Sequence, residues 1–176
     1  DLWFGVLSHL KELLKDPSYK IRDSGLDALF SLIMNFGYTF KPDFWLKVNT
    51  EIIKSSLEDM IKCFVPQGEI ISMKSQLNKA FLHTSKLIAV YLNENETFLQ
   101  EFVGIVIFCL GIKNEFLAKL SLNSFRTILA KSSKRFSRTT WEFVVKFITE
   151  LLIESTPSRL MDRENLEIAF PKNSSE

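Results

Sequence analysis

The stretch Asn35–Trp45, NFGYTFKPDFW, places a phenylalanine five positions before a tryptophan, Phe40 and Trp45. The same spacing returns in AKSSKRFSRTTW, which contains Phe136 and ends at Trp141. The two pairs lie 96 residues apart in a chain that has only 3 tryptophans. Because self-similarity at a fixed separation is the signature of a repeat architecture, this recurrence decides how the rest of the chain is interpreted.

Other apolar residues match at the same separation without a gap. Chance pairing of apolar residues in two amphipathic helices is the alternative. The two Phe-to-Trp segments match across a turn as well as within helices, which favours a true internal repeat. The additional identities are Leu14 with Leu110, Leu26 with Leu122, Val48 with Val144, and Ile52 with Ile148.

The composition is that of a folded domain. The chain has 176 residues, 46% of them hydrophobic, and a net charge of +1. These values argue against disorder and against a globally basic nucleic-acid binder. Phenylalanine is common, with 16 residues against 3 tyrosines. Phenylalanine fills apolar space without a polar group to satisfy, so a large core is expected.

Cysteine usage and apolar runs restrict the setting of the protein. The two cysteines, Cys63 and Cys109, suit a reducing compartment and provide no disulfide framework. No signal peptide is visible, and the longest apolar run, 102–112, is too short to span a membrane. The chain begins at Asp1 without a methionine, which we interpret as a piece of a longer protein.

Apolar residues recur at helical spacing along nearly the whole chain, and no segment has the sequence pattern of a β-strand. Asp16-Pro17 ends the first helix, Gly37 is expected to be a left-handed C-cap, and Pro42 begins a helix. The clearest break is at 66–68. The predicted helices run approximately over 2–15, 18–36, 42–64, 70–92, 96–111, 114–133 and 138–154.

These features predict an all-α fold, a HEAT/armadillo-like helical solenoid of about seven antiparallel helices with an internal repeat. The repeat domain is expected to cover 1–157, and the tail 158–176 to be extended or partly disordered. Phe40 and Phe136 each lie two residues before the start of a predicted helix. Trp45 and Trp141 lie one turn inside these helices. That is the arrangement of a hydrophobic staple, so these four aromatic residues are assigned a structural role.

The motifs resemble a known family. Asp16-Pro17, Ile21-Arg22, Gly25 and Leu29 look like the second helix of a HEAT repeat. Together with Trp3-Phe4, Leu29-Phe30, Gly37, Phe40 and Trp45, they resemble the C-terminal helical region of the large Arf guanine-nucleotide exchange factors. The brefeldin A-inhibited exchange proteins of the trans-Golgi network are the branch that the chain resembles most. The later segment LAKLSLNSFRTILAKSSKRFSRTTWEFVVKFITELLIESTP is similar to the same family.

The resemblance implies that the exchange domain, with its catalytic glutamate, lies outside this chain. The chain would be a regulatory segment that helps recruit the protein to Golgi membranes, binds small GTPases or controls autoinhibition. A related non-catalytic Golgi scaffold of the Mon-two type shares similar helical segments and is an alternative. Gly5 and Ser18 depart from the family pattern, since the family has proline and arginine there.

No catalytic, cofactor or metal site is predicted. His9 and His83 have no metal-ligand spacing with Cys63 or Cys109. The six glycines are scattered and form no phosphate-binding loop. Packing or surface roles explain these residues more simply than chemistry does.

One group of charges is a candidate partner-binding site: Lys131, Lys134, Arg135 and Arg138. A solvated basic turn beside a helix C-terminus is the simpler interpretation. Contact with anionic lipid or with an acidic partner surface is the functional one. The matching turn 37–41 lacks this charge, so the fold does not need it. Three serines within the group suggest a phosphorylation switch, Ser132, Ser133 and Ser137.

The sequence therefore favours a non-catalytic interaction segment of a large Arf exchange factor, cytoplasmic and peripheral at Golgi or trans-Golgi network membranes. Small GTPases of the Arf or Rab type are the expected partners, with no nucleic acid. Anionic Golgi membrane, other segments of the same protein and a second copy are further candidates. A structural spacer or dimerisation solenoid, and an enzyme domain with an unrecognised site, are the rival interpretations.

Overall fold

The computed structural model describes residues 2–67, 70–92 and 97–155. Every regular element within these ranges is helical, and no strand occurs in them. The elements are α1 (Leu2–Leu13), α2 (Tyr19–Phe36), η1 (Gly37–Thr39), α3 (Pro42–Lys47), η2 (Val48–Lys54), α4 (Ser55–Gln67), α5 (Ile71–Tyr91), α6 (Thr97–Gly111), α7 (Glu115–Ser132), η3 (Ser133–Arg135) and α8 (Arg138–Ser155).

Elements α3, η2 and α4 follow one another without a break, so the described residues form seven continuous helices. This confirms the predicted all-α fold. The third helix is longer than predicted, because Pro66 lies in its last turn instead of ending it. Proline lacks the N–H that would bond to the preceding turn, and the helix ends one residue after it, at Gln67. The predicted tail, 158–176, lies outside the described residues.

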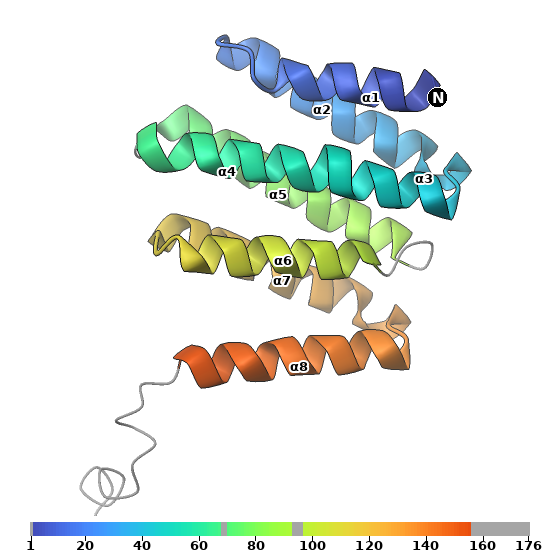
Figure 1. Ribbon diagram of the computed structural model, residues 1–176, viewed down its shortest axis with the longest axis vertical. Coiled ribbons are helices and arrows are strands. Elements are labelled where there is room, and N and C mark those ends of the chain that lie inside the picture. The colour runs from blue at the N-terminus through green and yellow to red at the C-terminus, as the bar shows by residue number, and fades with distance from the viewer. Residues whose placement is uncertain (1, 68–69, 93–96, 156–176) are drawn as a thin grey trace, which may run out of the picture. The chain divides into compact units, whose positions relative to one another are not determined.

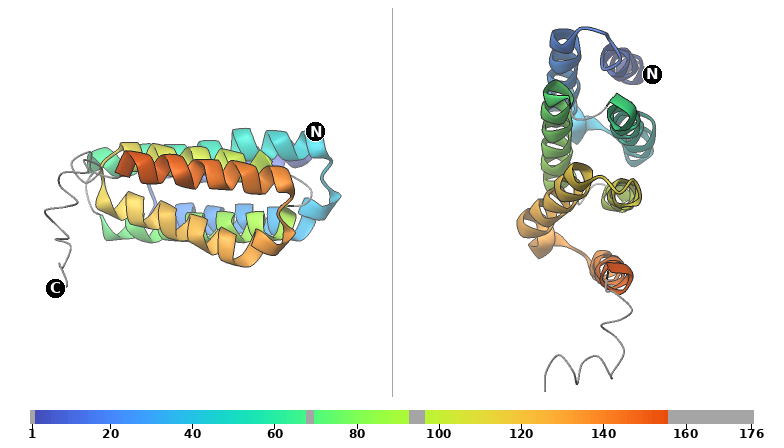
Figure 2. Two further views of the ribbon diagram at one scale, coloured as in Figure 1. Left: turned by 90° about the horizontal axis from the view of Figure 1, so that it is seen from below. Right: turned by 90° about the vertical axis from the view of Figure 1, so that its left-hand side faces the viewer.

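The chain divides into two compact units, Asp1–Arg135 and Phe136–Glu176. In the first unit the helices stack in two layers, which Figures 1 and 2 show from three directions. Helices α1, α3–α4 and α6 form one layer, and α2, α5 and α7 form the other. Each helix packs on its sequence neighbour in the opposite layer and on the next helix of its own, as in a solenoid. The described part of the second unit is α8.

The layers of the first unit meet along apolar stripes. Helix α2 turns Leu29 and Ile33 fully inward, and α5 does the same with Phe81 and Ile88. Burying each such side chain contributes about 1.5–3 kcal/mol relative to leaving it exposed. No helix pair could bury its stripe alone, which is why the pairs must stack.

The turn between α1 and α2 is held by the residues of the HEAT-like motif. The Asp16 carboxylate accepts a hydrogen bond from the Ser18 N–H at 2.7 Å. The Arg22 guanidinium donates to the carbonyls of Asp16 and Pro17 at 2.7 and 2.9 Å. Its Nε also donates to Oε1 of Gln76 on α5 at 3.2 Å. Arg22 thus joins the first helix pair to the next one.

From α2 to the start of α3, the internal repeat recurs in the local structure residue for residue. Moving the bounds of α2 by 96 positions gives those of α7, and moving η1 gives η3. The same shift takes the first residue of α3, Pro42, to the first residue of α8, Arg138. Two segments with few identities therefore begin and end their helices at equivalent positions, because the spacing of apolar residues and turns is kept.

Gly37 corrects one expectation from the sequence. Its φ of −57° is right-handed, so the predicted left-handed C-cap is wrong. A Cβ at this position would lie 2.6 Å from Cζ2 of Trp45 and 3.0 Å from Cζ of Tyr91. Glycine is needed here because two aromatic rings approach the backbone closely, and not because of its conformational freedom.

A polar seam joins α2 to α5. Nζ of Lys79 lies 2.9 Å from Oδ2 of Asp23 and 2.6 Å from Oδ2 of Asp27. His83 stacks on Phe30, with ring centroids 5.2 Å apart, and its Nε2 lies 3.5 Å from Oδ1 of Asp27. Burial lowers the pKa of Lys79, but its hydrogen bonds to the two carboxylates outweigh this and leave the pKa raised.

His83 predicts a stability that depends on pH. Burial, with the nearby charge of Lys86, lowers the pKa of His83 in spite of the opposing effect of Asp27. The unfolded chain therefore takes up this proton at a higher pH than the folded chain does, starting near 6.5. The free energy of unfolding should be at its full value above that pH and should fall as the pH drops below it.

Urea unfolding of a His9→Gln variant at pH 7.5 and pH 5.5 measures this effect, because His83 is then the only histidine. We expect a lower free energy of unfolding at pH 5.5, and a smaller loss when His83→Gln is added. An equal loss with and without His83 would show that other groups cause it.

Candidate interaction surfaces

The structure places three of the four predicted basic residues together on the first unit. Lys131 lies in the last turn of α7, and Lys134 and Arg135 form most of η3. Arg138 is the first residue of α8 and belongs to the second unit. Lys131 and Lys134 are exposed and form no ion pair with any described residue. These two lysines are the part of the cluster that is available to a partner.

Arg135 has a structural partner that the sequence did not reveal. Its guanidinium donates to the carbonyl oxygens of Ala89 and Val90. Both carbonyls belong to the last turn of α5, where backbone acceptors have no partner within the helix. Arg135 therefore caps α5, and a substitution that tests binding must leave it in place.

Arg138 and Ser137 also have partners, both within the second unit. Nε of Arg138 lies 2.9 Å from Oε1 of Glu142, one turn along α8, and its side chain is 92% exposed. Such a surface pair contributes little to stability. Ser132 is fully buried, which argues against its phosphorylation in the folded chain. The Ser137 hydroxyl caps α8 by accepting from the Thr140 N–H at 3.1 Å.

The two Phe–Trp pairs have the same local geometry in different surroundings. Phe40 and Phe136 each lie two residues before a helix whose fourth residue is Trp45 or Trp141, the positions of a hydrophobic staple. Ring centroids are 5.3 Å apart in the first pair and 5.2 Å in the second, with interplanar angles of 63° and 65°. Trp45 is fully buried, however, whereas Trp141 is 42% exposed.

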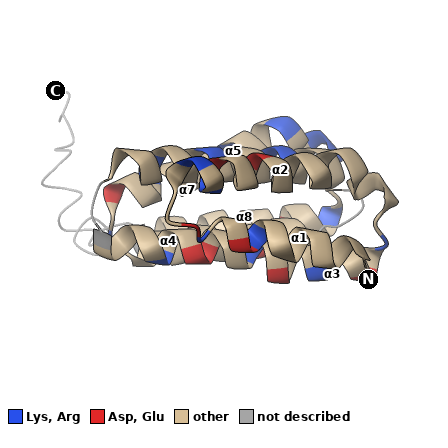
Figure 3. Cartoon of the chain, turned by 90° about the horizontal axis from the view of Figure 1, so that it is seen from above, with Lys and Arg blue, Asp and Glu red and all other residues tan. Residues whose placement is uncertain are grey.

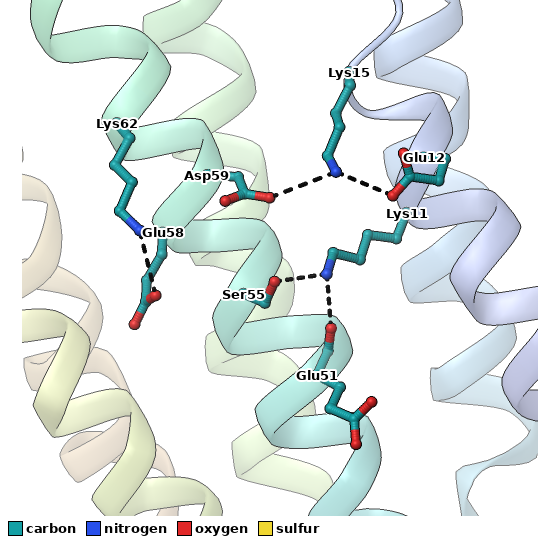
Figure 4. A network of polar contacts seen from close by, with 8 residues as sticks. All are labelled: Lys11, Glu12, Lys15, Glu51, Ser55, Glu58, Asp59 and Lys62. Carbon is teal, nitrogen blue, oxygen red and sulfur yellow. Dashed lines mark hydrogen bonds and ion pairs between the residues drawn. The ribbon is translucent and has the colours of Figure 1, made fainter.

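The π-helix η2 was not predicted. Figure 4 shows Lys11 reaching from α1 to this segment, where its ammonium donates to the carbonyl of Glu51 at 2.9 Å and to the hydroxyl of Ser55 at 2.6 Å. On its other side, Lys54 pairs with Glu101 of α6. π-Helical turns are rare and frequently occur at functional sites.

Two buried polar residues without partners lie in or next to this segment, Asn49 within η2 and Ser56 in the first turn of α4. Asn49 is 1% exposed, and neither of its amide atoms has a hydrogen-bond partner among the described residues. Ser56 is 4% exposed, and its hydroxyl is likewise unpartnered in the described structure. Both interrupt an apolar stripe that includes Ile52 and Ile53. That interruption is the sequence signal that would have identified them.

Charge is mixed in the layer that contains α1 and α4. Figure 3 shows acidic and basic residues interspersed there. Lys15 illustrates the pattern, with its Nζ 3.0 Å from Oε1 of Glu12 and 3.9 Å from Oδ2 of Asp59. Hydrogen bonding to Glu12 raises the pKa of Lys15.

Metal binding and membrane insertion find no support in the described part of the chain. No group of three or more His, Cys, Asp or Glu side chains there is placed to hold a metal ion. None of the helices in 2–67, 70–92 and 97–155 is both long enough and apolar enough to cross a membrane. The described structure is that of an all-α helical-repeat protein.

The chain is similar to large Arf exchange factors, which confirms the resemblance seen in the sequence. It is 18% identical over 95% of its length to the ADP-ribosylation factor guanine nucleotide-exchange factor SEC7 of Saccharomyces cerevisiae. Brefeldin A-inhibited guanine nucleotide-exchange protein 1 of Bos taurus is 20% identical over 90% of the chain. Brefeldin A-inhibited guanine nucleotide-exchange protein 2 of Arabidopsis thaliana is 34% identical over 38% of the chain.

The chain spans 9% of the length of the first two relatives and 4% of the third. No protein-family model and no solved structure matches it.

Proposed function

We propose that this chain is a non-catalytic regulatory and interaction segment of a large Arf guanine-nucleotide exchange factor that acts in Golgi vesicle traffic. Its similarity over nearly its whole length to a small part of two such proteins supports the proposal most directly. A helical solenoid offers extended faces on which a folded partner can dock. The site of action would be the cytoplasmic face of Golgi or trans-Golgi network membranes.

The proposed partners are small GTPases of the Arf or Rab type, which would contact the basic turn formed by Lys131 and Lys134. Both side chains are exposed and free of ion pairs with described residues, so binding would not have to break an existing pair. Charges at the edge of an interface mainly accelerate association and select among partners. Arg135 would hold the turn against α5.

Charge reversal at the basic turn tests this function. We expect the 176-residue chain to bind an Arf- or Rab-type GTPase more tightly with a GTP analogue than with GDP, measured by biolayer interferometry. Lys131→Glu with Lys134→Glu should weaken that binding several-fold, more at low salt than at high salt. Arg135 stays unchanged because its removal would release the end of α5.

A variant with Lys20→Glu and Arg126→Glu is the matched control, since it makes the same change in net charge at two other exposed positions of α2 and α7. GTP-selective binding that survives the change at the basic turn would move the site to another face. If no GTPase binds in either nucleotide state, a structural spacer or dimerisation segment becomes the better account.

A further inference from the structure

A cavity of about 380 Å³ opens between the α1–α2 turn, α4 and α5, entirely within the first unit. Its volume falls within the range of about 300–1,000 Å³ that is typical of sites for small molecules. It lies apart from the basic turn, because none of Lys131, Lys134 and Arg135 lines it. The function proposed above makes no use of this cavity.

One wall of the cavity is apolar. Leu26 of α2 and Leu77 of α5 are each 1% exposed and contribute to the lining, and Met60 and Met73 complete this wall from α4 and α5. Methionine adapts to irregular shapes because its side chain is unbranched and flexible. A surface of this kind suits the hydrocarbon part of a ligand.

Ser56 belongs to the residues that line the same cavity, and its buried hydroxyl has no hydrogen-bond partner among the described residues. Buried serine and threonine hydroxyls in helices usually bond back to a carbonyl of the preceding turn. Thr84 and Ser85 do so here, to Ala80 and Phe81 at 2.9 and 2.8 Å. Ser56 does not, which leaves a hydroxyl able to donate to a ligand.

Two of the three cations that line the cavity, Lys11 and Arg22, have only neutral partners. Lys11 donates to a carbonyl and a hydroxyl, as Figure 4 shows, and Arg22 donates to two carbonyls and a side-chain amide. Neither forms an ion pair with a described residue. The third lining cation, Lys15, pairs with the lining carboxylate of Asp59, and the Asp16 carboxylate accepts a hydrogen bond from the Ser18 N–H. Positive charge without a counter-charge favours an anion in a partly buried site.

We propose that this cavity binds a small amphiphilic carboxylate, such as a medium-chain fatty acid. The hydrocarbon body would lie against Leu26, Met60, Met73 and Leu77, and the carboxylate would be neutralised by Lys11 or Arg22. The Ser56 hydroxyl would donate a hydrogen bond to a carboxylate oxygen. The three observations are independent, since the apolar wall, the unpartnered hydroxyl and the uncompensated cations involve different residues.

Cys63 provides the measurement because it is exposed and also lines the cavity. The other cysteine, Cys109, is buried, and burial raises its pKa to about 11. Only a thiolate reacts rapidly with an alkylating reagent, so Cys63 should be labelled first. The rate of labelling by N-ethylmaleimide, followed by intact mass, therefore reports whether the cavity is occupied.

Octanoate should slow the labelling of Cys63 in the 176-residue chain, and the effect should saturate. Octylamine and octanol should protect at least several-fold less well at equal concentration because they lack the anionic head. Acetate should not protect because it lacks the apolar body. Equal protection by octylamine, or none by octanoate, would overturn the proposal.

Two substitutions separate binding from folding. Ser56→Ala removes a hydroxyl that has no partner, so it should leave the melting temperature unchanged or raised while weakening protection by octanoate several-fold. Lys11→Met should reduce the preference for octanoate over octanol. If neither variant changes protection while both remain folded by circular dichroism, the cavity is not the site.

Discussion

Replacing Trp45 by alanine is expected to lower the free energy of unfolding by about 3–5 kcal/mol, the cost of removing a buried aromatic side chain and leaving a cavity. Trp45 is fully buried. Its ring contacts Phe40, Tyr91 and Phe98, with centroid distances of 5.3, 4.9 and 6.3 Å. The side chain therefore joins the start of α3 to α5 and α6. Urea unfolding followed by circular dichroism measures the change.

Trp141→Ala is the matched control, because Trp141 occupies the equivalent position and has the same geometry with Phe136. Trp141 is 42% exposed, so Trp141→Ala should lower the free energy of unfolding by no more than about half as much as Trp45→Ala does. Trp45→Phe should also cost less than Trp45→Ala. It keeps a ring and removes an indole N–H that has no acceptor among the described residues. Equal losses for both alanine variants would refute the distinction between a buried and a partly exposed pair.

Gly37→Ala is expected to destabilise the fold by about 1–3 kcal/mol, the usual cost of adding a methyl group to a filled space. The new Cβ would lie 2.6 Å from Cζ2 of Trp45. That ring is fixed by its aromatic neighbours and cannot move away freely. The backbone itself would accept alanine, since φ at this position is −57°. Chemical denaturation of the wild type and the variant gives the difference directly.

Gly104→Ala serves as the control. Gly104 lies inside α6, and a Cβ there would have no neighbour within 4 Å. Alanine should therefore stabilise the chain by about 0.5–1 kcal/mol, since glycine is a poor helix former. A double-mutant cycle adds a second check, because Gly37→Ala should cost much less in a Trp45→Ala background where the ring is gone. Additive losses would contradict the proposed clash.

The sequence predicted the helices well because their signals are local. Apolar residues at helical spacing, Pro42 at a helix start and the Asp16-Pro17 stop all act within one or two turns. The internal repeat was visible for the same reason, since a match at 96 positions needs no knowledge of contacts. The Phe–Trp spacing identified the staple positions at the entrances to α3 and α8.

The candidate sites were predicted less completely. Four basic residues adjacent in sequence seemed equivalent, yet Arg135 caps α5 and Arg138 belongs to a different unit from the others. Ser56 and Asn49 each interrupt an apolar stripe in the sequence, but only the structure shows that both are buried without a hydrogen-bond partner among the described residues. The π-helix η2 was also missed, because π-helical segments are rare and were not considered among the expected elements.

The sequence by itself determined the helical class, the order and approximate ends of the helices, and the repeat, because each depends on residues close together in the chain. Only the tertiary structure decided that Gly37 must be small, that Trp45 is buried while Trp141 is not, and that an apolar cavity forms beside Lys11, Arg22 and Ser56. Those features depend on side chains from several helices meeting in space. Burial, close approach and the absence of a hydrogen-bond partner belong to that arrangement and not to any single segment.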